Sequence, residues 1–332
     1  MDKKLSIKLA SEGFIYEKTA SGLSEHTISD YYVTFKKLFL YFPEDTILEK
    51  LSRNDLLGFF NWLQTDYVSE PGGVAPRGKI KLAPKSIANI HTNLSSFWTW
   101  AVKEGYVKEH IIRKIPKPRH ESPVIEPFTK DQIEALLKAC ENKKAYNTKN
   151  KTIKIKRDTA VRDKAIIMVL LDTGIRVSEI CDICIQDLNL TEKTIKVGGK
   201  GKGRDKKERI VHLGKTAASI IHKHILPRLE ELQPDDPLFF PNNGVVLKSF
   251  NRSILGKLLK RIGDRAGVPG VHPHRFRHTF GITYLRNGGD IFTLQRLLGH
   301  SDLNTVKIYA RIANCDTERM HRKASPVDNW RL

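Results

Sequence analysis

A proline-rich segment divides this chain of 332 residues into a shorter and a longer part. The segment, RKIPKPRHESPVIEP, covers residues 113–127 and has prolines at positions 116, 118, 123 and 127. Proline lacks the backbone N–H and fixes φ, so a helix cannot pass through the segment and extended backbone is favoured. A chain of this length is also large for one compact unit. We therefore expect two domains, residues 1–112 and 128–332, joined by a basic linker at 113–127.

The residues before the linker are patterned for helices. Apolar side chains recur with a 3.6-residue period, or are bounded by helix start and stop signals, in residues 24–42, 52–64 and 84–105. Ser24 stands at an N-cap position, and Ser52 is followed three residues later by Asp55 in capping-box spacing. The sequence predicts a small all-helical domain, interrupted by a basic loop rich in Gly and Pro at 70–81.

The residues after the linker combine helices with one strand pair. Helical patterns cover residues 129–140, 165–183 (broken at Gly174), 214–232, 250–267, 273–288, 290–300 and 302–312. In TIKVGGKGKGRDKKERIVHL, residues 194–213, two β-prone runs flank a turn rich in Gly and Lys, which is typical of a β-hairpin. The predicted fold class is mainly α with a small antiparallel β-sheet.

The charge of the chain points to a polyanionic partner. Lys and Arg total 57 against 37 Asp and Glu, which gives a formal net charge of +20. Such an excess is most often used to neutralise nucleic acid. An anionic membrane surface is the alternative, but neither a basic amphipathic helix nor a lipidation motif is present. We expect double-stranded DNA as the partner and no membrane.

The sequence also bears on the compartment. No run of about 18 apolar residues occurs, and MDKKLSIKLASEGF lacks the apolar block and cleavage site of a signal peptide. The four cysteines are too few and too scattered for a disulfide framework. We expect a cytoplasmic protein with reduced thiols.

The densest group of cations is HPHRFRHTF, residues 272–280. Pro273 suits the first position of a helix, where its missing N–H costs nothing. His274 and Arg277 then lie three residues apart on one face, and Phe276 and Phe280 lie four apart on another. One face is polar and suited to an anion, and the other belongs to the core.

Metal binding is the alternative explanation of these histidines. His272, His274 and His278 could in principle share an ion, but no carboxylate or cysteine accompanies them at ligand spacing, and the interleaved arginines would repel a cation. Cys181 and Cys184 have no second Cys or His pair at zinc spacing, so we expect core-facing thiols. The sequence predicts no metal site.

Three further signals are individually weak. The residues concerned are Arg176 and Glu179 in DTGIRVSEI, Lys200 and Lys202 in the hairpin turn, and His300 and Tyr309 in LLGHSDLNTVKIYARI. Taken alone, the first pair is an ordinary surface ion pair and the lysines are a solvated charge run. A tyrosine among apolar helical residues is more often a core residue than a nucleophile.

Their order along the chain is specific. TGIRVSE, the GKG hairpin, HxxRH, LGH and a tyrosine nine residues further on resemble, in order and spacing, the catalytic domain of the tyrosine recombinases, also called the phage integrase family. The resemblance covers residues 128–315 and extends more loosely to the N-terminal helices, which look like the family's SAM-like core-binding domain. It implies a two-domain clamp around duplex DNA, and cleavage through a 3'-phosphotyrosyl intermediate.

The resemblance assigns a role to each position. Tyr309 matches the nucleophile, and Arg176 and Arg277 match the two arginines that contact the scissile phosphate. His274 matches the histidine that handles the proton, and His300 matches the position that bonds the phosphate.

Four further positions complete the set, one catalytic lysine with its alternative and two supporting residues. Lys200 matches the lysine that protonates the leaving 5'-oxygen, with Lys202 as the alternative because the turn carries an extra Gly and Lys. Glu179 and His278 match positions that support the arginines and histidines without touching DNA. The implied chemistry uses neither a nucleotide nor a metal ion.

The family contains several functions. Only about twenty residues precede the first predicted helix, so we expect a recombinase without an additional N-terminal DNA-binding domain. The long basic segment 143–164 favours integration and excision of a mobile element, with Xer-type resolution of chromosome or plasmid dimers as the alternative. A non-catalytic DNA-binding protein of the same fold and a type IB topoisomerase remain open.

Assembly follows from the same resemblance. We expect a homo-tetramer on two DNA sites, in which the tail 310–332 packs on a neighbouring protomer, and an accessory protein such as an excisionase.

Overall fold

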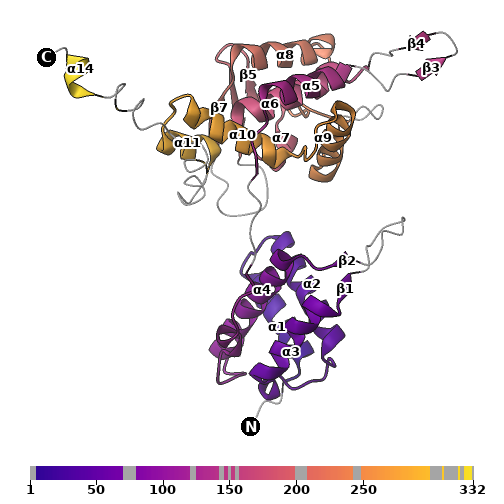
Figure 1. The fold of residues 1–332 in the computed structure, drawn as a ribbon, viewed down its shortest axis with the longest axis vertical. Helices are drawn as coiled ribbons and strands as arrows, with labels where there is room; N and C mark the ends of the chain where they lie inside the picture. The colour runs from indigo at the N-terminus through magenta and orange to yellow at the C-terminus, as the bar shows by residue number, and fades with distance from the viewer. Residues whose placement is uncertain are drawn as a thin grey trace. The chain divides into compact units, whose positions relative to one another are not determined.

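The computed structural model describes residues 5–69, 80–119, 125–141, 146–148, 151–153, 157–198, 208–241, 248–299, 309, 321 and 325–330 (Figure 1). Backbone proximity divides the chain into two compact units, one containing residues 1–124 and the other containing residues 125–201 and 205–332. Each unit has a hydrophobic core of its own. No helix within the described ranges is long and apolar enough to cross a bilayer.

The first unit is helical, as the sequence predicts. Its main helices are α1 (Ile7–Ala20), α2 (Glu25–Tyr41), α3 (Arg53–Thr65) and α4 (Pro84–Lys103), with short 3-10 turns η1 (Leu48–Lys50) and η2 (Ile111–Lys114). Phe14 lies at the centre of an aromatic cluster, with ring centroids 4.8 Å from Tyr31 and 5.5 Å from Phe97. Edge-to-face ring pairs of this kind add to the stabilisation from buried area.

Helix α1 shows that one prediction is wrong. The first helix begins at Ile7, whereas the sequence pattern placed the first helix at residue 24. Ser6 caps it by accepting a hydrogen bond from the backbone N–H of Leu9 at 3.3 Å, and Ile7, Ala10 and Phe14 are buried on one face. The pattern is hard to recognise because Ala10 contributes little hydrophobicity and Lys and Glu residues separate the apolar positions.

The predicted helix starts in this unit are confirmed. The Ser24 hydroxyl accepts a hydrogen bond from the Thr27 N–H at 3.2 Å at the start of α2. At the start of α3, the Ser52 hydroxyl accepts from the Asp55 N–H at 3.3 Å, and the Asp55 carboxylate accepts from the Ser52 N–H at 2.8 Å. Each such cap contributes about 1 kcal/mol by satisfying N–H groups that have no partner inside the helix.

The segments at the two ends of α4 contain short elements that the sequence did not predict. β1 (Val68–Ser69) pairs antiparallel with β2 (Ile80–Lys81), and the loop between them lies outside the described residues. Beyond α4, Ile112 and Ile115 are buried in the core of the first unit. Part of the proline-rich segment is therefore anchored to the helices before it.

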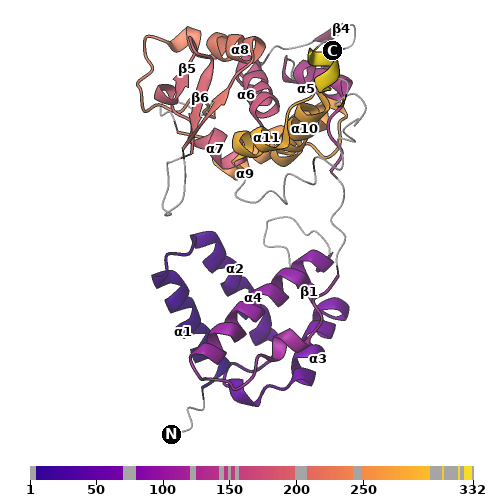
Figure 2. The ribbon, with the colours of Figure 1, turned by 90° about the vertical axis from the view of Figure 1, so that its left-hand side faces the viewer.

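The second unit carries the helices expected between residues 129 and 300 and a small sheet, whereas the helix predicted at 302–312 lies outside the described residues except for Tyr309 (Figure 2). Its helices are α5 (Lys130–Glu141), α6 (Ala160–Thr173), α7 (Val177–Asp182), α8 (Lys215–Ile225), α9 (Arg252–Ala266), α10 (Pro273–Arg286), α11 (Ile291–Leu298) and α14 (Pro326–Trp330), with 3-10 turns η3 (Ile185–Asp187) and η4 (Leu226–Arg228). The three-stranded antiparallel sheet has the order β5 (Leu188–Asn189), β6 (Thr194–Val197), β7 (Arg209–His212). The predicted fold class, mainly α with a small antiparallel sheet, is confirmed.

The predicted hairpin corresponds to β6 and β7. Ile195 is paired with Val211 and Val197 with Arg209, and the buried residues alternate along each strand. The turn between them, residues 199–207, lies outside the described residues. A second antiparallel pair, β3 (Tyr146–Thr148) with β4 (Lys151–Ile153), lies within the basic segment 143–164.

Gly174 separates α6 from α7, where the sequence predicts a break. Its φ of +61° is in the left-handed region, and its backbone N–H bonds the carbonyl of Leu170 at 3.1 Å. A Cβ at this position would lie 2.5 Å from Phe280 Cδ1 and 2.8 Å from Leu298 Cδ2. Both the backbone conformation and the close packing therefore require glycine, and the turn brings α6, α10 and α11 together.

Replacing Gly174 by alanine should destabilise the second unit. We expect a loss of about 2–5 kcal/mol, because the left-handed conformation costs about 1–2 kcal/mol and the overpacking costs about 1–3 kcal/mol. Gly256, inside α9, has no atom within 4 Å of the Cβ position. The control Gly256→Ala should therefore gain about 0.5–1 kcal/mol. Urea unfolding measures both, and equal stabilities of the two variants would contradict this packing.

Candidate active site

The end of helix α11 is the anchor of the site. The last carbonyl groups of a helix have no partner within the helix, and they carry its negative dipole end. Helix α11 ends at Leu298 and is closed by Gly299, whose φ is +64°. Three carbonyl oxygens here accept hydrogen bonds from arginines: Leu297 from Arg209 Nε at 2.8 Å, Leu298 from Arg277 Nη2 at 2.7 Å, and Gly299 from Arg176 Nη2 at 2.8 Å.

Arg277 is the most buried of these arginines. Its side chain comes from α10, the residue is 3% exposed, and Nη1 also donates to the carbonyl of Gly174 at 2.8 Å. It therefore links the end of α6 to the end of α11. Burial, followed by the nearby Arg176 charge, lowers the pKa of Arg277 to about 10, so it remains a cation at neutral pH.

Arg176 stands at the N-cap of α7 and is more accessible. Its side chain is 43% exposed, and Nη1 donates to Glu179 Oε1 at 3.1 Å. The backbone N–H of Arg176 donates to Glu179 Oε2 at 2.7 Å, so the carboxylate also caps the helix. The predicted Arg176–Glu179 pair is thus present, held by a backbone bond as well as by charge.

Arg209 completes the group and was missed by the sequence analysis. From the first position of β7, its Nη1 and Nη2 donate to Glu179 Oε1 and Oε2 at 2.7 and 3.0 Å. A signal for it exists, because Arg209 shares the inward face of the strand with Val211, two residues on. A charged residue on a buried strand face needs a partner.

Glu179 is the one carboxylate that these arginines contact in the described part of the chain. Burial alone would raise its pKa, but hydrogen bonds from Arg209 and from the Arg176 backbone, and both guanidinium charges, lower the pKa below its ordinary value. The group is an anion at neutral pH. Three arginines and one carboxylate leave an excess of positive charge around the end of α11.

Tyr309 lies beside this group and is almost completely buried, at 1% exposure. Its ring packs on α10, where a Cβ on Gly281 would lie 3.2 Å from ring atoms, and its centroid is 5.1 Å from that of His278. Burial raises the pKa of the phenol, although the charge and a hydrogen bond of Arg277 and the charge of Arg176 oppose the rise. The phenol is protonated and shielded from solvent in this structure.

Two histidines of α10 lie on the same side as Tyr309. His274 and His278 have ring centroids 4.4 Å apart. Burial and the charge of Arg277 lower the pKa of His274, and burial and neighbouring His274 lower that of His278 to about 4. Both are neutral at neutral pH. Nδ1 of His278 is buried and has no hydrogen-bond partner among the residues that the structure describes.

His272 and Arg275 support the fold. The sequence analysis considered His272 only as a possible metal ligand and gave Arg275 no role. Nδ1 of His272 accepts a hydrogen bond from the Arg275 N–H at 3.2 Å and caps α10. The guanidinium of Arg275 lies 4.1 Å from the ring centroid of Phe128 and donates to the carbonyls of Glu126 and Pro269. These contacts fasten the first residues of the second unit to α10.

The remaining predictions concern the hairpin lysines, His300, a metal site and the cysteines. Lys200, Lys202 and His300 lie outside the described residues. No cluster of three or more potential metal ligands occurs in the described ranges. Cys181 is buried, which raises the pKa of its thiol to about 12 and agrees with a core-facing cysteine, whereas Cys184 is only partly buried and does not belong to the core.

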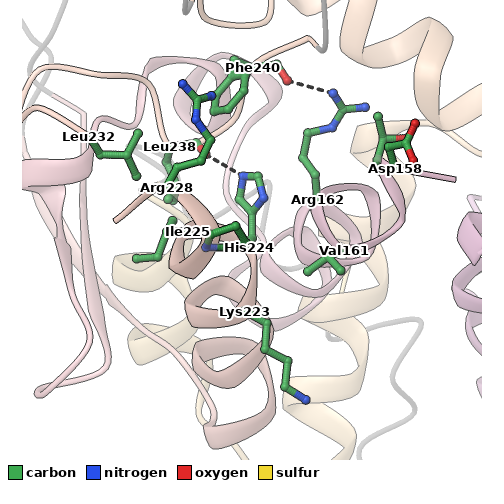
Figure 3. A pocket seen from close by; sticks show the side chains of 12 residues that line it. Asp158, Val161, Arg162, Lys223, His224, Ile225, Arg228, Leu232, Leu238 and Phe240 are labelled. Atoms are coloured by element: carbon green, nitrogen blue, oxygen red, sulfur yellow. Dashed lines mark hydrogen bonds between the residues drawn. The ribbon is translucent and has the colours of Figure 1, made fainter. Parts of the chain in front are cut away.

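A cavity of about 220 Å³ lies apart from this site, between the start of α6 and the end of α8 (Figure 3). Two of its polar side chains bond the backbone: Arg162 Nη1 donates to the carbonyl of Phe240 at 2.8 Å, and His224 Nε2 bonds the carbonyl of Leu238 at 3.0 Å. Arg228 lies over the Phe240 ring, 5.0 Å from its centroid. The cavity shares no lining residue with the arginine group.

The partly buried His278 beside Tyr309 should make the protein sensitive to acid. His278 stays neutral in the folded state down to about pH 4, whereas in the unfolded chain it takes up a proton near 6.5. Its contribution to stability is therefore complete above pH 6.5 and is lost as the pH falls towards 4. Urea unfolding at pH 7.5 and pH 5 should show a smaller acid-induced loss in His278→Phe than in the wild type. The control His222→Gln, at an exposed position of α8, should behave like the wild type, and equal losses in all three proteins would contradict the prediction.

Comparison with known proteins places this geometry in a family. The model of the phage integrase family matches residues 126–315, and that of the phage integrase SAM-like domain matches residues 11–116. The chain belongs to the phage integrase family, whose members are tyrosine recombinases. It is therefore an enzyme of DNA strand cleavage and religation.

Particular relatives refine the comparison. The tyrosine recombinase XerD of Listeria innocua serovar 6a is 27% identical over 317 residues, which cover 92% of this chain and 94% of the relative. The tyrosine recombinase XerC of Thermodesulfovibrio yellowstonii is 33% identical over 291 residues, which cover 83% and 89%.

Solved structures share the fold. The Tn1549 transposon integrase in complex with transposon right end DNA has a TM-score of 0.71 and 16% identity, with coverage of 97% of this chain and 100% of the integrase chain. A lambda integrase (75–356) dimer bound to a COC' core site has a TM-score of 0.66 and 15% identity, with coverage of 91% and 97%.

Proposed function

We propose that this chain is an Xer-type site-specific recombinase that resolves dimers of chromosomes or plasmids. The support is the set of relatives named XerD and XerC, which match most of the chain at 26% to 33% identity. Integration and excision of a mobile element, which the sequence analysis favoured, rests on the basic segment 143–164 alone. The relatives favour the Xer alternative.

The observation that carries the catalytic proposal is the arginine group at the end of α11, with the Tyr309 phenol beside it. A phosphodiester gains negative charge as it passes through a pentavalent transition state, and preorganised cations lower that barrier directly. Arg176 and Arg277 are the cations proposed to contact the phosphate oxygens. Their planar guanidinium groups suit two-point contact, and hydrogen bonds to carbonyls fix their orientation before DNA arrives.

The proposed reaction is a transesterification. The oxygen of Tyr309 attacks the phosphorus, the bond to the 5'-oxygen breaks, and a 3'-phosphotyrosyl link forms. Neutral His274 takes the phenolic proton, which its lowered pKa permits at neutral pH. Lys200, or Lys202 as the alternative, gives a proton to the leaving 5'-oxygen, and His300 bonds the phosphate. Religation is the reverse reaction, so the cycle uses no nucleotide and no metal ion.

Because the phenol is buried, we propose that this conformation is a resting state of the enzyme. With 1% exposure and a pKa raised by burial, Tyr309 cannot reach a phosphodiester without a local rearrangement. We therefore propose that DNA binding and exposure of Tyr309 are coupled.

The proposed partner is duplex DNA, held in a clamp by the two units, which the linker at 113–127 connects. The net charge of +20 supports binding to many phosphates. We propose a homo-tetramer on two DNA sites, with the tail 310–332 packed on a neighbouring protomer. Chromosomal DNA as substrate implies action in the cytoplasm. An excisionase belongs only to the mobile-element alternative.

Removal of the Tyr309 hydroxyl should abolish covalent chemistry and leave DNA binding intact. Incubation with a nicked suicide substrate in the presence of EDTA should give a covalent protein–DNA adduct with the wild type and none with Tyr309→Phe. The control is Tyr284→Phe, a second tyrosine in the same small hydrophobic cluster, which should still form the adduct. Persistence of the adduct in Tyr309→Phe would rule out the assigned nucleophile.

Deletion of the gene in its host distinguishes the two biological functions. An Xer-type enzyme predicts that chromosome or plasmid multimers accumulate, and that a gene copy encoding Tyr309→Phe does not reverse the accumulation. Multimer content is measured by gel electrophoresis of intact DNA. If multimers stay at the wild-type level while the circular junction of a mobile element disappears, the Xer proposal is wrong.

A further inference from the structure

Arg209 occupies an unusual position for a charged residue. It is the first residue of β7, directly after the hairpin turn that contains Lys200 and Lys202, and its side chain is only 15% exposed. On the same strand, Ile210 points outward at 61% exposure and Val211 is buried. The strand therefore directs a guanidinium into the protein, where it must be paired to be tolerated.

The surroundings of Arg209 are shaped to hold it. Its three nitrogen atoms donate to Glu179 Oε1 and Oε2 and to the carbonyl of Leu297. A Cβ on Gly299 would lie 3.0 Å from Nη1 of Arg209, so the close approach of the guanidinium to the helix end depends on glycine. Arg209 thus joins the base of the hairpin to α7 and to α11.

The hydrogen bonds of Glu179 show what Arg209 does for Arg176. Each carboxylate oxygen accepts two bonds: Oε1 from Nη1 of Arg176 and Nη1 of Arg209, and Oε2 from the Arg176 N–H and Nη2 of Arg209. A carboxylate offers about four acceptor positions, and all are used. Because Arg209 occupies two of them, Glu179 accepts a single bond from the Arg176 side chain.

We propose that Arg209 is a positioning residue for the cleavage reaction. By saturating Glu179, it prevents the carboxylate from binding the Arg176 guanidinium at two points and drawing it away from the phosphate. It also fixes the start of β7 against α7 and α11. The inference rests on the proposed function, because it assumes that Arg176 contacts the scissile phosphate.

Loss of Arg209 leaves Glu179 as an under-compensated anion beside Arg176. The two vacated acceptor positions then compete with the phosphate for the Arg176 N–H groups, and the arginine group loses one of its three cations. Both effects disfavour the transition state more than they disfavour DNA binding, because charge develops at the phosphate during the reaction. Neutralising Glu179 in the same variant removes the competitor.

The test is single-turnover cleavage of a suicide substrate at saturating protein. Arg209→Met should slow adduct formation by about 10–100-fold, the usual effect of losing a group that orients a functional side chain. The double variant Arg209→Met with Glu179→Gln should recover most of that loss. Arg209→Lys should remain slow, because an ammonium group cannot bond both carboxylate oxygens in a planar fork.

A matched control pair lies on the same hairpin. Lys196 and Glu208 form a salt bridge at 2.6 Å with both side chains 51% exposed. Lys196→Met removes the same charge from the base of the hairpin, and it should change the rate less than about 3-fold, with or without Glu208→Gln, as expected for an exposed pair. DNA affinity and thermal unfolding midpoints, measured for every variant, separate chemistry from binding and folding.

The outcomes are distinct. Recovery of the rate by Glu179→Gln, with unchanged DNA affinity, supports the positioning role. A double variant as slow as Arg209→Met, or a rate loss that follows DNA affinity or unfolding midpoint, overturns it. Absence of the adduct in the wild type overturns the proposed function itself. If the wild type forms the adduct but Glu179→Gln does not restore the rate of Arg209→Met, only the role of Arg209 is overturned.

Discussion

The site depends on hydrogen bonds between arginine side chains and the final carbonyl groups of α11. Burying a guanidinium is costly unless its N–H groups are bonded, and carboxylates are the usual partners. Here backbone carbonyls supply most of the bonds, and they carry only partial negative charge. The arginines are therefore fixed in position while Glu179 offsets only one of their three charges, and the positive charge that remains is what a phosphate-binding site requires.

Helix α10 serves both the fold and the site. Arg275 bonds the carbonyl of Glu126 at the end of the linker, and Phe276 is buried in the core. Arg277 belongs to the arginine group, and His274 lies on the solvent side of the helix. Gly281 leaves room for the Tyr309 ring on the same helix. The site is thus built on elements whose packing also stabilises the unit, so changes in the helix should affect stability and activity together.

Sequence reasoning predicted the features that have local signatures. Ser52 and Asp55 indicated the start of α3, and Gly174 indicated the break after α6. The turn rich in Gly and Lys, between two β-prone runs, predicted the pair β6 and β7. The family resemblance singled out Arg176, Glu179 and Arg277, which the structure brings together, and Tyr309, which lies beside Arg277. The catalytic roles of these residues stay predictions, as do those of Lys200 and His300.

What the sequence did not reveal depends on tertiary contacts. Helix α1 has too weak an apolar stripe to be recognised until Phe14 packs among the rings of α2 and α4. Arg209 is one of three Lys and Arg residues in KKERIVHL, and its alternation with Val211 identifies the inward face only once the strand and its pairing with β6 are known. Besides the nearby carbonyl of Pro269, the guanidinium of Arg275 bonds groups far away in sequence: the carbonyl of Glu126 and the side chain of Gln132, which is 143 residues away. Such contacts follow from the fold as a whole and not from local pattern.

The central claim is that the arginine group and Tyr309 form one cleavage site. The most direct measurement is mass-spectrometric mapping of the peptide that stays bound to DNA after wild-type protein reacts with a suicide substrate. The account predicts a nucleotide linked through its 3'-phosphate to Tyr309. A link to Tyr284, the other tyrosine of that cluster, or to a serine, would contradict it.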